Sequence, residues 1–153
     1  MVKSYRGVGE IRTKKVKVQP VTVEDYMTRR LITFHPDQTM DHVVSVLLAK
    51  NIGGGPVIDD DKNLCGIISE GDCLKEVVKG KYNNSPNLSG KVSEHMATNI
   101  KSVHPEMNIF ELAQMFLSMR LRRFPVLRDG KLVGQISQKD IMRAVQKLKN
   151  TTW

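Results

Sequence analysis

Two short patterns place a hydroxyl and a carboxylate where an apolar run gives way to a helical one. They are Ser69-Glu70-Gly71-Asp72 and Ser137-Gln138-Lys139-Asp140. The first turn of a helix carries unpaired backbone N–H groups and a positive potential, which favour anions. An aspartate there can accept from two vicinal hydroxyls, as in a ribose, and a serine hydroxyl can donate to a phosphate. The pattern thus indicates a nucleoside-phosphate site in outline, and the alternative is that both serines only cap helices.

A pair of adjacent arginines, Arg122 and Arg123, is the second candidate for chemistry. Guanidinium groups make bidentate, charge-assisted contacts to phosphate, although a solvated corner between a helix and a strand is the alternative. The sequence has no Walker-type pattern and no histidine pair at metal-ligand spacing, and Cys65 and Cys73 belong to no Cys-x-x-Cys or His/Cys cluster. We therefore predict no catalytic residue, no metal ligand and no enzyme activity.

The elements that must position these residues occur twice. The two parts of the chain match at an offset of 69 residues, which becomes 68 after one deleted residue, over more than fifty positions. Matched pairs include Met27/Met96, His35/His104, Pro56/Pro125, Gly66/Gly134 and Asp72/Asp140. One deletion over that length indicates a tandem duplication, so the two halves should share one structure.

Each half predicts the order strand, helix, strand, hairpin turn, strand, helix. Thr39 and Asn108 can cap the first helices, whose apolar residues recur at helical spacing. Short apolar runs bounded by turn-forming residues then predict a hairpin in each half. The second helices should begin near Glu70 and Gln138.

Both halves resemble the CBS domain, the cystathionine-β-synthase-type repeat, whose pairs form a Bateman module. The resemblance is carried by Met27-Thr28 and Met96-Ala97, by the Pro-Val strands, and by residues 66–72 and 134–140. The last two fit the pattern G-h-h-[ST]-x-x-D except at Gln135. The resemblance implies an α+β fold with α/β-type repeats, in which a tandem pair of repeats packs with pseudo-twofold symmetry.

Each repeat is expected to contain a small three-stranded sheet and two helices. We assign residues 1–20 to a basic N-terminal arm, 21–79 to the first repeat, 80–90 to an exposed linker and 91–149 to the second repeat. A single repeat of this size is near the lower limit for an independent core, so we expect the two to pack as one unit.

The resemblance further implies a regulatory module that binds an adenosine-containing ligand, AMP, ADP or ATP, between the repeats, with no obligatory cofactor. In this family basic residues before the Pro-Val strand often reach the ligand phosphates, which favours the site of the second repeat. The expected nucleotide site comprises Asp140, Ser137, Arg122, Arg123, Thr28, Ile32, Thr33, Gly54 and Gly55. A weaker second site would comprise Asp72, Ser69, Thr98, Lys101 and Ser102.

The partners expected from the same resemblance are a regulated protein of unknown identity, reached in trans, and a second copy of the chain. CBS modules pair through their helices into disc-like dimers. We expect the core or interface positions to be Met115, Phe116, Met119, Ile141, Met142 and Val145. The alternative is that all six residues belong to the core of one chain.

The net charge of +8 is concentrated at the N-terminus. Residues 1–20 hold six basic residues against one acidic, and the remaining 133 hold 18 against 15. A wholly basic nucleic-acid-binding domain is therefore disfavoured. The alternative function is nucleic-acid binding or protein docking through the arm, with no nucleotide bound. The sequence has neither a secretory signal nor an apolar run near the ~18 residues of a membrane span, so we predict a cytoplasmic protein without membrane contact.

Overall fold

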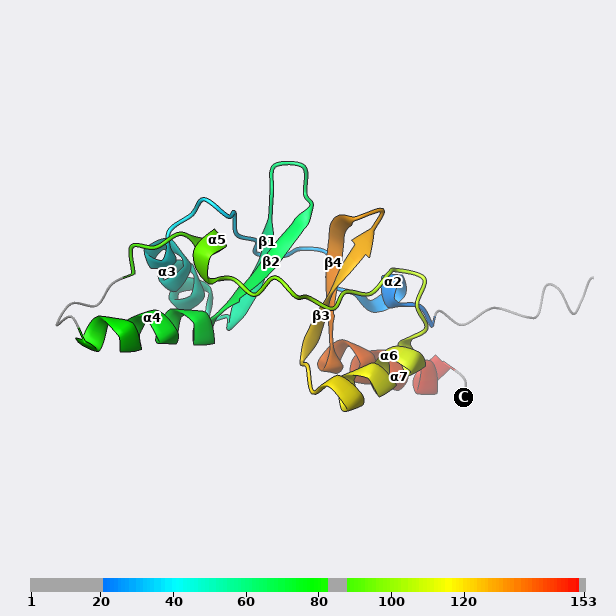
Figure 1. Ribbon diagram of the computed structural model, residues 1–153. Coiled ribbons are helices and arrows are strands. Elements are labelled where there is room, and N and C mark those ends of the chain that lie inside the picture. The colour runs from blue at the N-terminus through cyan, green and yellow to red at the C-terminus, as the bar shows by residue number, and fades with distance from the viewer. Residues whose placement is uncertain (1–20, 83–87, 152–153) are drawn as a thin grey trace, which may run out of the picture.

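The computed structural model describes residues 21–82 and 88–151, so the basic arm lies outside the described residues. The first half contains α2 (Val23–Tyr26), α3 (Met40–Lys50), β1 (Gly54–Ile58), β2 (Leu64–Ser69) and α4 (Glu70–Tyr82). The second half repeats this order with α5 (Val92–His95), α6 (Ile109–Met119), β3 (Arg123–Arg128), β4 (Lys131–Ser137) and α7 (Gln138–Thr151). The hairpins lie in the middle of the molecule, and α4, α6 and α7 lie along one edge (Figure 1).

The helix starts confirm the predicted caps. The Thr39 hydroxyl accepts from the His42 N–H at 3.1 Å, and the Asn108 side chain accepts from the Phe110 N–H at 2.7 Å. These bonds satisfy backbone donors that have no partner inside the helix. Among the described residues no helix is both long and apolar enough to cross a membrane.

Each half forms one antiparallel hairpin, β1 with β2 and β3 with β4. The predicted third strand of each sheet is reduced to a parallel bridge of one residue, Phe34 with Val57 and Val103 with Val126. The hairpins themselves match the predicted strands. The third strand is short because the chain just before it pairs with the opposite half.

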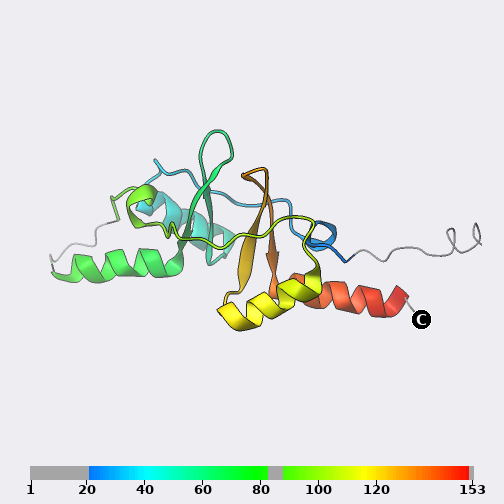
Figure 2. The ribbon, with the colours of Figure 1, turned by 45° about the vertical axis from the view of Figure 1, so that its right-hand side comes forward.

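This crossing is made by the segment that follows the leading helix of each half. Thr28 exchanges backbone hydrogen bonds with Gln135 of the second hairpin at 2.8 and 2.9 Å. Ala97 makes the same exchange with Ile67 of the first hairpin, at 2.9 Å in both directions. Each segment therefore starts on one hairpin and ends on the other (Figure 2). Backbone hydrogen bonds thus join the two halves.

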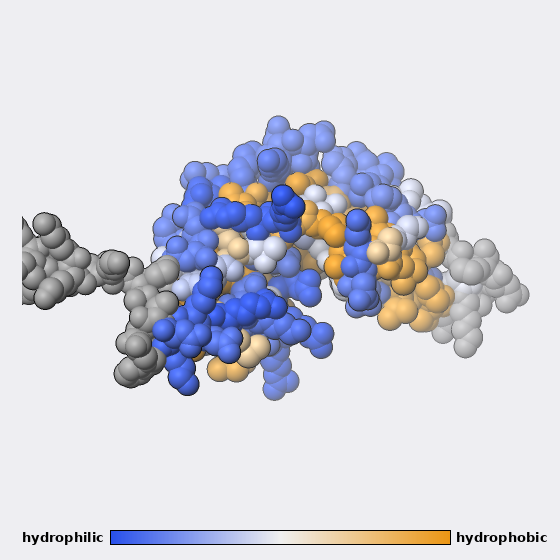
Figure 3. All heavy atoms as spheres, turned by 180° about the vertical axis from the view of Figure 1, so that it is seen from behind, coloured by the Kyte–Doolittle hydropathy of each residue, from blue (hydrophilic) through white to orange (hydrophobic). Residues whose placement is uncertain are grey.

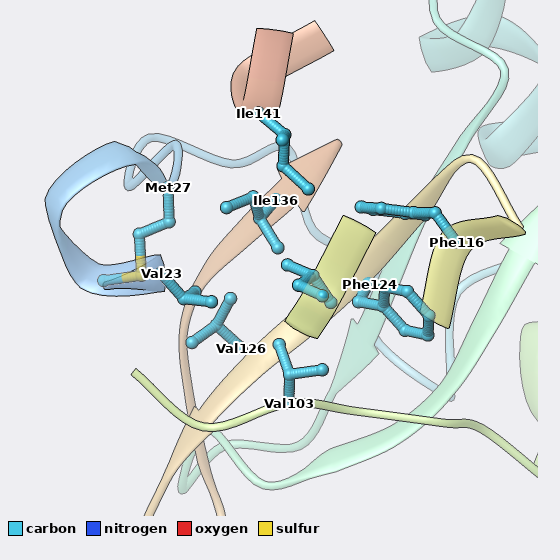
Figure 4. Close-up of a cluster of buried hydrophobic side chains, with 9 residues drawn as sticks. Val23, Met27, Val103, Phe116, Phe124, Val126, Ile136 and Ile141 are labelled. Carbon is cyan, nitrogen blue, oxygen red and sulfur yellow. The ribbon is translucent and has the colours of Figure 1, made fainter. Parts of the chain in front are cut away.

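The leading helices consequently complete each other's cores. Val23 and Met27 of the first half pack into the cluster of the second half, beside Phe116, Val126 and Ile136 (Figure 4). The α5 helix and the residue after it contribute in the same way to the core of the first half. Buried apolar surface is the main favourable contribution to folding, so each half gains stability from residues of the other.

The glycines of the G-h-h pattern make room for this exchange. A Cβ atom at Gly66 would lie 2.6 Å from the Met96 Sδ, and one at Gly134 would lie 2.7 Å from the Met27 Sδ. Atoms do not approach that closely, so a side chain at either glycine would displace the crossing segment. The two positions match in the repeat, as do the two methionines.

The predicted exposed linker, residues 80–90, is only partly a connection. Helix α4 continues to Tyr82, and residues 83–87 lie outside the described residues. The Leu88 side chain is half-buried against the first core. The carbonyls of Leu88 and Gly90 accept from the N–H groups of Asp41 and Met40 at 2.7 Å. This end of the segment is ordered because the first amides of α3 need acceptors.

Candidate functional site

The two Ser-x-x-Asp patterns make the same cap at the starts of α7 and α4. The Ser137 N–H and hydroxyl donate to Asp140 Oδ2 at 2.8 and 3.0 Å. The Ser69 N–H and hydroxyl donate to Asp72 Oδ2 at 2.9 and 3.0 Å. One oxygen of each carboxylate is thus held by the cap. The other oxygen of Asp140, Oδ1, accepts from Arg143 Nη1 at 3.3 Å.

A pocket of about 280 Å³ opens between the bases of the two hairpins. Gly53, Gly54 and Gly55 form part of one side, and Arg122 and Arg123 line it from the second half. These residues occupy equivalent positions in the two repeats, so the pocket lies on the pseudo-twofold axis. The structure thus brings together two features of the predicted site, a bare backbone wall and a pair of guanidinium groups.

Residues 53–55 form a wall of the pocket without side chains, and at Gly54 and Gly55 a Cβ atom would collide with neighbouring backbone. A Cβ atom at Gly54 would lie 2.5 Å from the carbonyl oxygen of Ile68. At Gly55 it would lie 2.8 Å from the carbonyl oxygen of Ile32, which places Ile32 directly behind the wall. A planar ring can therefore approach the main chain of β1 closely.

Asp140 lines a different hollow, of about 400 Å³, between α2 and α7. The α2 side contributes Asp25 and Tyr26, followed by Met27, and Arg143 lies on the α7 side. Burial raises the pKa of the Tyr26 phenol, and the nearby Asp25 carboxylate raises that pKa further. The phenol therefore keeps its proton at neutral pH and can donate a hydrogen bond. Asp140 and the arginine pair do not line one cavity, contrary to the arrangement expected from the sequence.

Ser137 and Thr28, two residues of the predicted site, lie between the pocket and the hollow. Ser137 pairs with Arg123 across the β3–β4 hairpin. Thr28 follows Met27, which lines the hollow, and its backbone pairs with Gln135, which lines the pocket. A ligand longer than either cavity could contact both through these residues.

The residues of the expected second site are less closely gathered. Thr98 follows Ala97, whose backbone pairs with β2, so it lies beside the strand that leads to Ser69 and Asp72. Lys101 and Ser102 lie further along the chain and are exposed. Ser69 lines the pocket between the hairpins rather than a separate one. Thr33, expected in the stronger site, is half-buried one residue before the Phe34 bridge.

A buried carboxylate and an imidazole join the two halves, and the sequence analysis did not predict this contact. Glu76, on α4, is 7% exposed, and its Oε1 lies 2.7 Å from His95 Nδ1 on α5. The Lys79 Nζ lies 3.6 Å from the same oxygen. The equivalent positions in the other half are Ala144 and Tyr26. The signal in the sequence was the charge of Glu76 at a position where the other repeat has an alanine.

The cysteines are both unpaired thiols, and the Cys73 side chain is buried in the first core. Burial raises the pKa of the Cys73 thiol, and also that of Cys65. Both thiols therefore remain protonated at neutral pH, which is the less nucleophilic form. The described residues contain no group of three side chains suited to hold a metal ion.

Comparison with known families settles the origin of the repeat. A model of the CBS domain matches residues 23–79 and again residues 92–147. The chain belongs to the CBS domain family. The predicted tandem pair of CBS repeats is confirmed, and so is its mixed helix and strand fold.

Similar proteins contain the same CBS pair. The chain is 30% identical to CBSX2, a chloroplastic protein of Arabidopsis thaliana, over 86% of this chain and 66% of that protein. A crystal structure of CBSX2 in complex with AMP has a TM-score of 0.74 and 31% identity, and covers 85% of this chain and 99% of that one. YhcV of Bacillus subtilis is 29% identical over 84% of this chain and 87% of its own length.

A third structure shows only that the fold is shared. The CBS domain pair of protein MJ0100, solved with 5′-methylthioadenosine and S-adenosyl-L-methionine, has a TM-score of 0.68 at 24% identity. The match covers 84% of this chain and 99% of that one. The described CBS pair therefore has the architecture of complete CBS pairs in other proteins.

Proposed function

We propose that the chain is a cytoplasmic regulatory module that binds an adenine nucleotide between its CBS repeats and passes the signal to another protein. It acts by binding and not by catalysis. The observation that carries this proposal is the pocket on the pseudo-twofold axis, where Arg122 and Arg123 face the bare backbone of residues 53–55. A site with two guanidinium groups suits a phosphate, and a backbone wall suits a purine.

The AMP bound in the CBSX2 structure supports an adenosine-containing ligand for this chain. We place the phosphate at Arg122 and Arg123 and the ribose at Asp140, which has one oxygen held by its cap and the other directed to an exposed arginine. A ligand that reaches both groups stabilises the arrangement in which the two halves close around it. This change in closure is the proposed signal to the regulated protein.

The test is a calorimetric titration of AMP, ADP, ATP and adenosine into the unmodified chain and into Asp140→Asn. We expect at least one nucleotide to bind, and the substitution to weaken it tenfold or more because a charged acceptor is lost. Asp72→Asn is the matched control, since Asp72 makes the same cap in the first repeat. Both substitutions keep a side-chain oxygen that can accept the hydrogen bonds of the cap and remove one negative charge, so a larger loss of affinity in Asp140→Asn reports on the stronger site.

Two outcomes contradict the proposal. Either no nucleotide binds the unmodified chain at millimolar concentration, or Asp140→Asn and Asp72→Asn weaken binding equally. The second outcome would show that the aspartates act only as caps.

We also propose that the chain forms a homodimer through its helices. Of the six positions expected at the core or the interface, Phe116 and Ile141 are buried in the core of their own half, and Met115 and Met119 are partly buried against it. Met142 and Val145 are 61% and 43% exposed, so they remain available to a partner. Sedimentation velocity tests this directly, and a chain that stays monomeric at 100 µM would contradict it.

A further inference from the structure

The pocket on the pseudo-twofold axis has an amide on one side where its other side is apolar. Its lining includes two cross-strand pairs, Pro56 with Ile67 on the first hairpin and Pro125 with Gln135 on the second. The two pairs occupy matched positions in the repeat. The molecular surface shows a similar contrast from behind, where the first half carries a broad apolar region and the second half is largely hydrophilic (Figure 3).

The fold itself does not require a glutamine at position 135. The backbone N–H and carbonyl of Gln135 exchange hydrogen bonds with Thr28, and those of Ile67 make the same exchange with Ala97. Both residues therefore have the same part in joining the halves, and isoleucine is sufficient for it. The amide side chain of Gln135 must have another reason.

The side chain of Gln135 points away from the core. Side chains alternate between the two faces of a strand, and the neighbours of Gln135 on β4, Gly134 and Ile136, lie against Met27 and in the core of the second half. Gln135 is half-buried in the pocket wall, and its side chain makes no hydrogen bond to any residue that the structure describes. A partly desolvated amide without a partner costs free energy, which a bound ligand with matching groups would recover.

The position of Gln135 selects the part of a nucleotide that it meets. Arg123 pairs with Ser137 at the base of the hairpin, and Gln135 lies two residues further along β4, a distance of about 7 Å. A phosphate at the arginines therefore leaves Gln135 facing the nucleoside. Two other polar groups line the pocket, but the Ser69 hydroxyl donates to the cap of its own helix and Glu70 is exposed.

We propose that Gln135 determines which base the pocket accepts. Its side-chain carbonyl accepts a hydrogen bond from the 6-amino group of a purine, and its side-chain N–H donates to the adjacent ring nitrogen. A primary amide is complementary to this edge of adenine because both carry one donor beside one acceptor. The inference rests on the proposed nucleotide binding and adds to it a requirement for a 6-aminopurine.

The test compares two nucleotides that differ only in the 6-amino group. AMP and purine riboside 5′-monophosphate, which lacks this group, are titrated by calorimetry into the unmodified chain and into Gln135→Ile. We expect the unmodified chain to bind AMP about tenfold more tightly, since the amide carbonyl has no donor when the amine is missing. Gln135→Ile should bind the two nucleotides within about twofold of each other.

The matched control is Ile67→Val, which changes the equivalent position of the first half and leaves the amide in place. This variant should keep the preference for AMP. Isoleucine at 135 suits a strand and already occupies the matched position, so Gln135→Ile should fold, and thermal unfolding verifies this. The preference of the unmodified chain tests the proposal without any variant.

Two results would overturn the inference alone. Either the unmodified chain binds both nucleotides equally, or Gln135→Ile loses affinity for both and keeps the preference for AMP. The second result would show that Gln135 contacts the phosphate or only packs against the ligand. If neither nucleotide binds the unmodified chain at millimolar concentration, the proposed function fails together with the inference.

Discussion

The two CBS repeats keep the same strand-to-helix junction and differ in what surrounds it. Both junctions hold an aspartate with a serine cap at nearly identical distances. One repeat has Gly53 and Gly54 where the other has Arg122 and Arg123. A glutamate of the first repeat contacts a histidine on the leading helix of the second repeat, and the matched residues are an alanine and a tyrosine. Both repeats have thus kept the Ser-x-x-Asp cap since the duplication, and the residues around the cap have diverged.

The largest expected effect comes from breaking the buried contact between Glu76 and His95, which joins the two halves. His95→Ala leaves the Glu76 carboxylate buried with only the more distant Lys79 ammonium beside it. Removal of one partner of a buried pair is strongly destabilising, so we expect a loss of about 3 kcal/mol in the free energy of unfolding. Urea unfolding measures it, and a loss below about 0.5 kcal/mol would show that the pair is solvated.

The residues matched to Glu76 and His95 in the repeat suggest a double substitution that removes both groups. Glu76→Ala combined with His95→Tyr reproduces the combination of Ala144 and Tyr26. We expect the double variant to lie within about 1 kcal/mol of the unmodified chain, because no charge is then left buried without a partner. If the double variant is less stable than His95→Ala alone, the two contacts are not interchangeable.

The next effect is on affinity. Arg122→Ala with Arg123→Ala should weaken AMP binding about 100-fold, since two charge-assisted contacts to the phosphate are removed. Both side chains are exposed, so the thermal midpoint should change little. Lys50→Ala removes an exposed cation at the end of α3 and serves as the control. Equal affinity of the unmodified chain for AMP and adenosine would show that the phosphate is not recognised.

The glycine wall should be sensitive to a single methyl group. Gly54→Ala brings a Cβ atom against the carbonyl of Ile68, and we expect a loss of about 2 kcal/mol in the free energy of unfolding. Gly71→Ala has open space around its Cβ and should change the stability by less than about 0.5 kcal/mol. If Gly54→Ala is as stable as the unmodified chain, the contact with the carbonyl of Ile68 is not the reason for glycine at 54.

The smallest effect concerns the arm. Deletion of residues 1–20 should leave the affinity for AMP unchanged within about twofold, because the proposed site contains no residue of the arm. A salt titration against duplex and single-stranded nucleic acid tests the alternative function. If the unmodified chain binds with a steep salt dependence that the deletion abolishes, the arm is a nucleic-acid contact.

The sequence predicts local structure well in this chain and long-range pairing poorly. Caps such as Thr39 and Asn108, with apolar residues at helical spacing, define helices through contacts between near neighbours. The pairing of Thr28 with Gln135 joins residues far apart in the sequence, and no local pattern encodes it. For this reason the third strand of each sheet was predicted longer than the single bridge that the structure contains.

The same contrast between local structure and long-range contacts applies to the candidate site. The resemblance to the family implied one site that contains Gly54, Gly55, Arg122 and Arg123, and these four residues do line one pocket. The separation of Asp140 from that pocket depends on how α2 packs against α7, which is a tertiary contact. The Ser-x-x-Asp spacing allowed two interpretations, a helix cap and a ligand contact, and the structure contains the cap. The contact of one ligand with both Asp140 and the arginine pair stays a prediction.

The crossing of the leading segments has a consequence for fragments of the protein. Each leading helix buries a valine in the core of the other half, and the methionine that follows the helix packs into or against the same core. Neither half therefore has a complete core of its own. A chain cut between the two repeats should give fragments that fold when they are mixed and not when they are refolded separately, and circular dichroism of the separate and mixed fragments measures this.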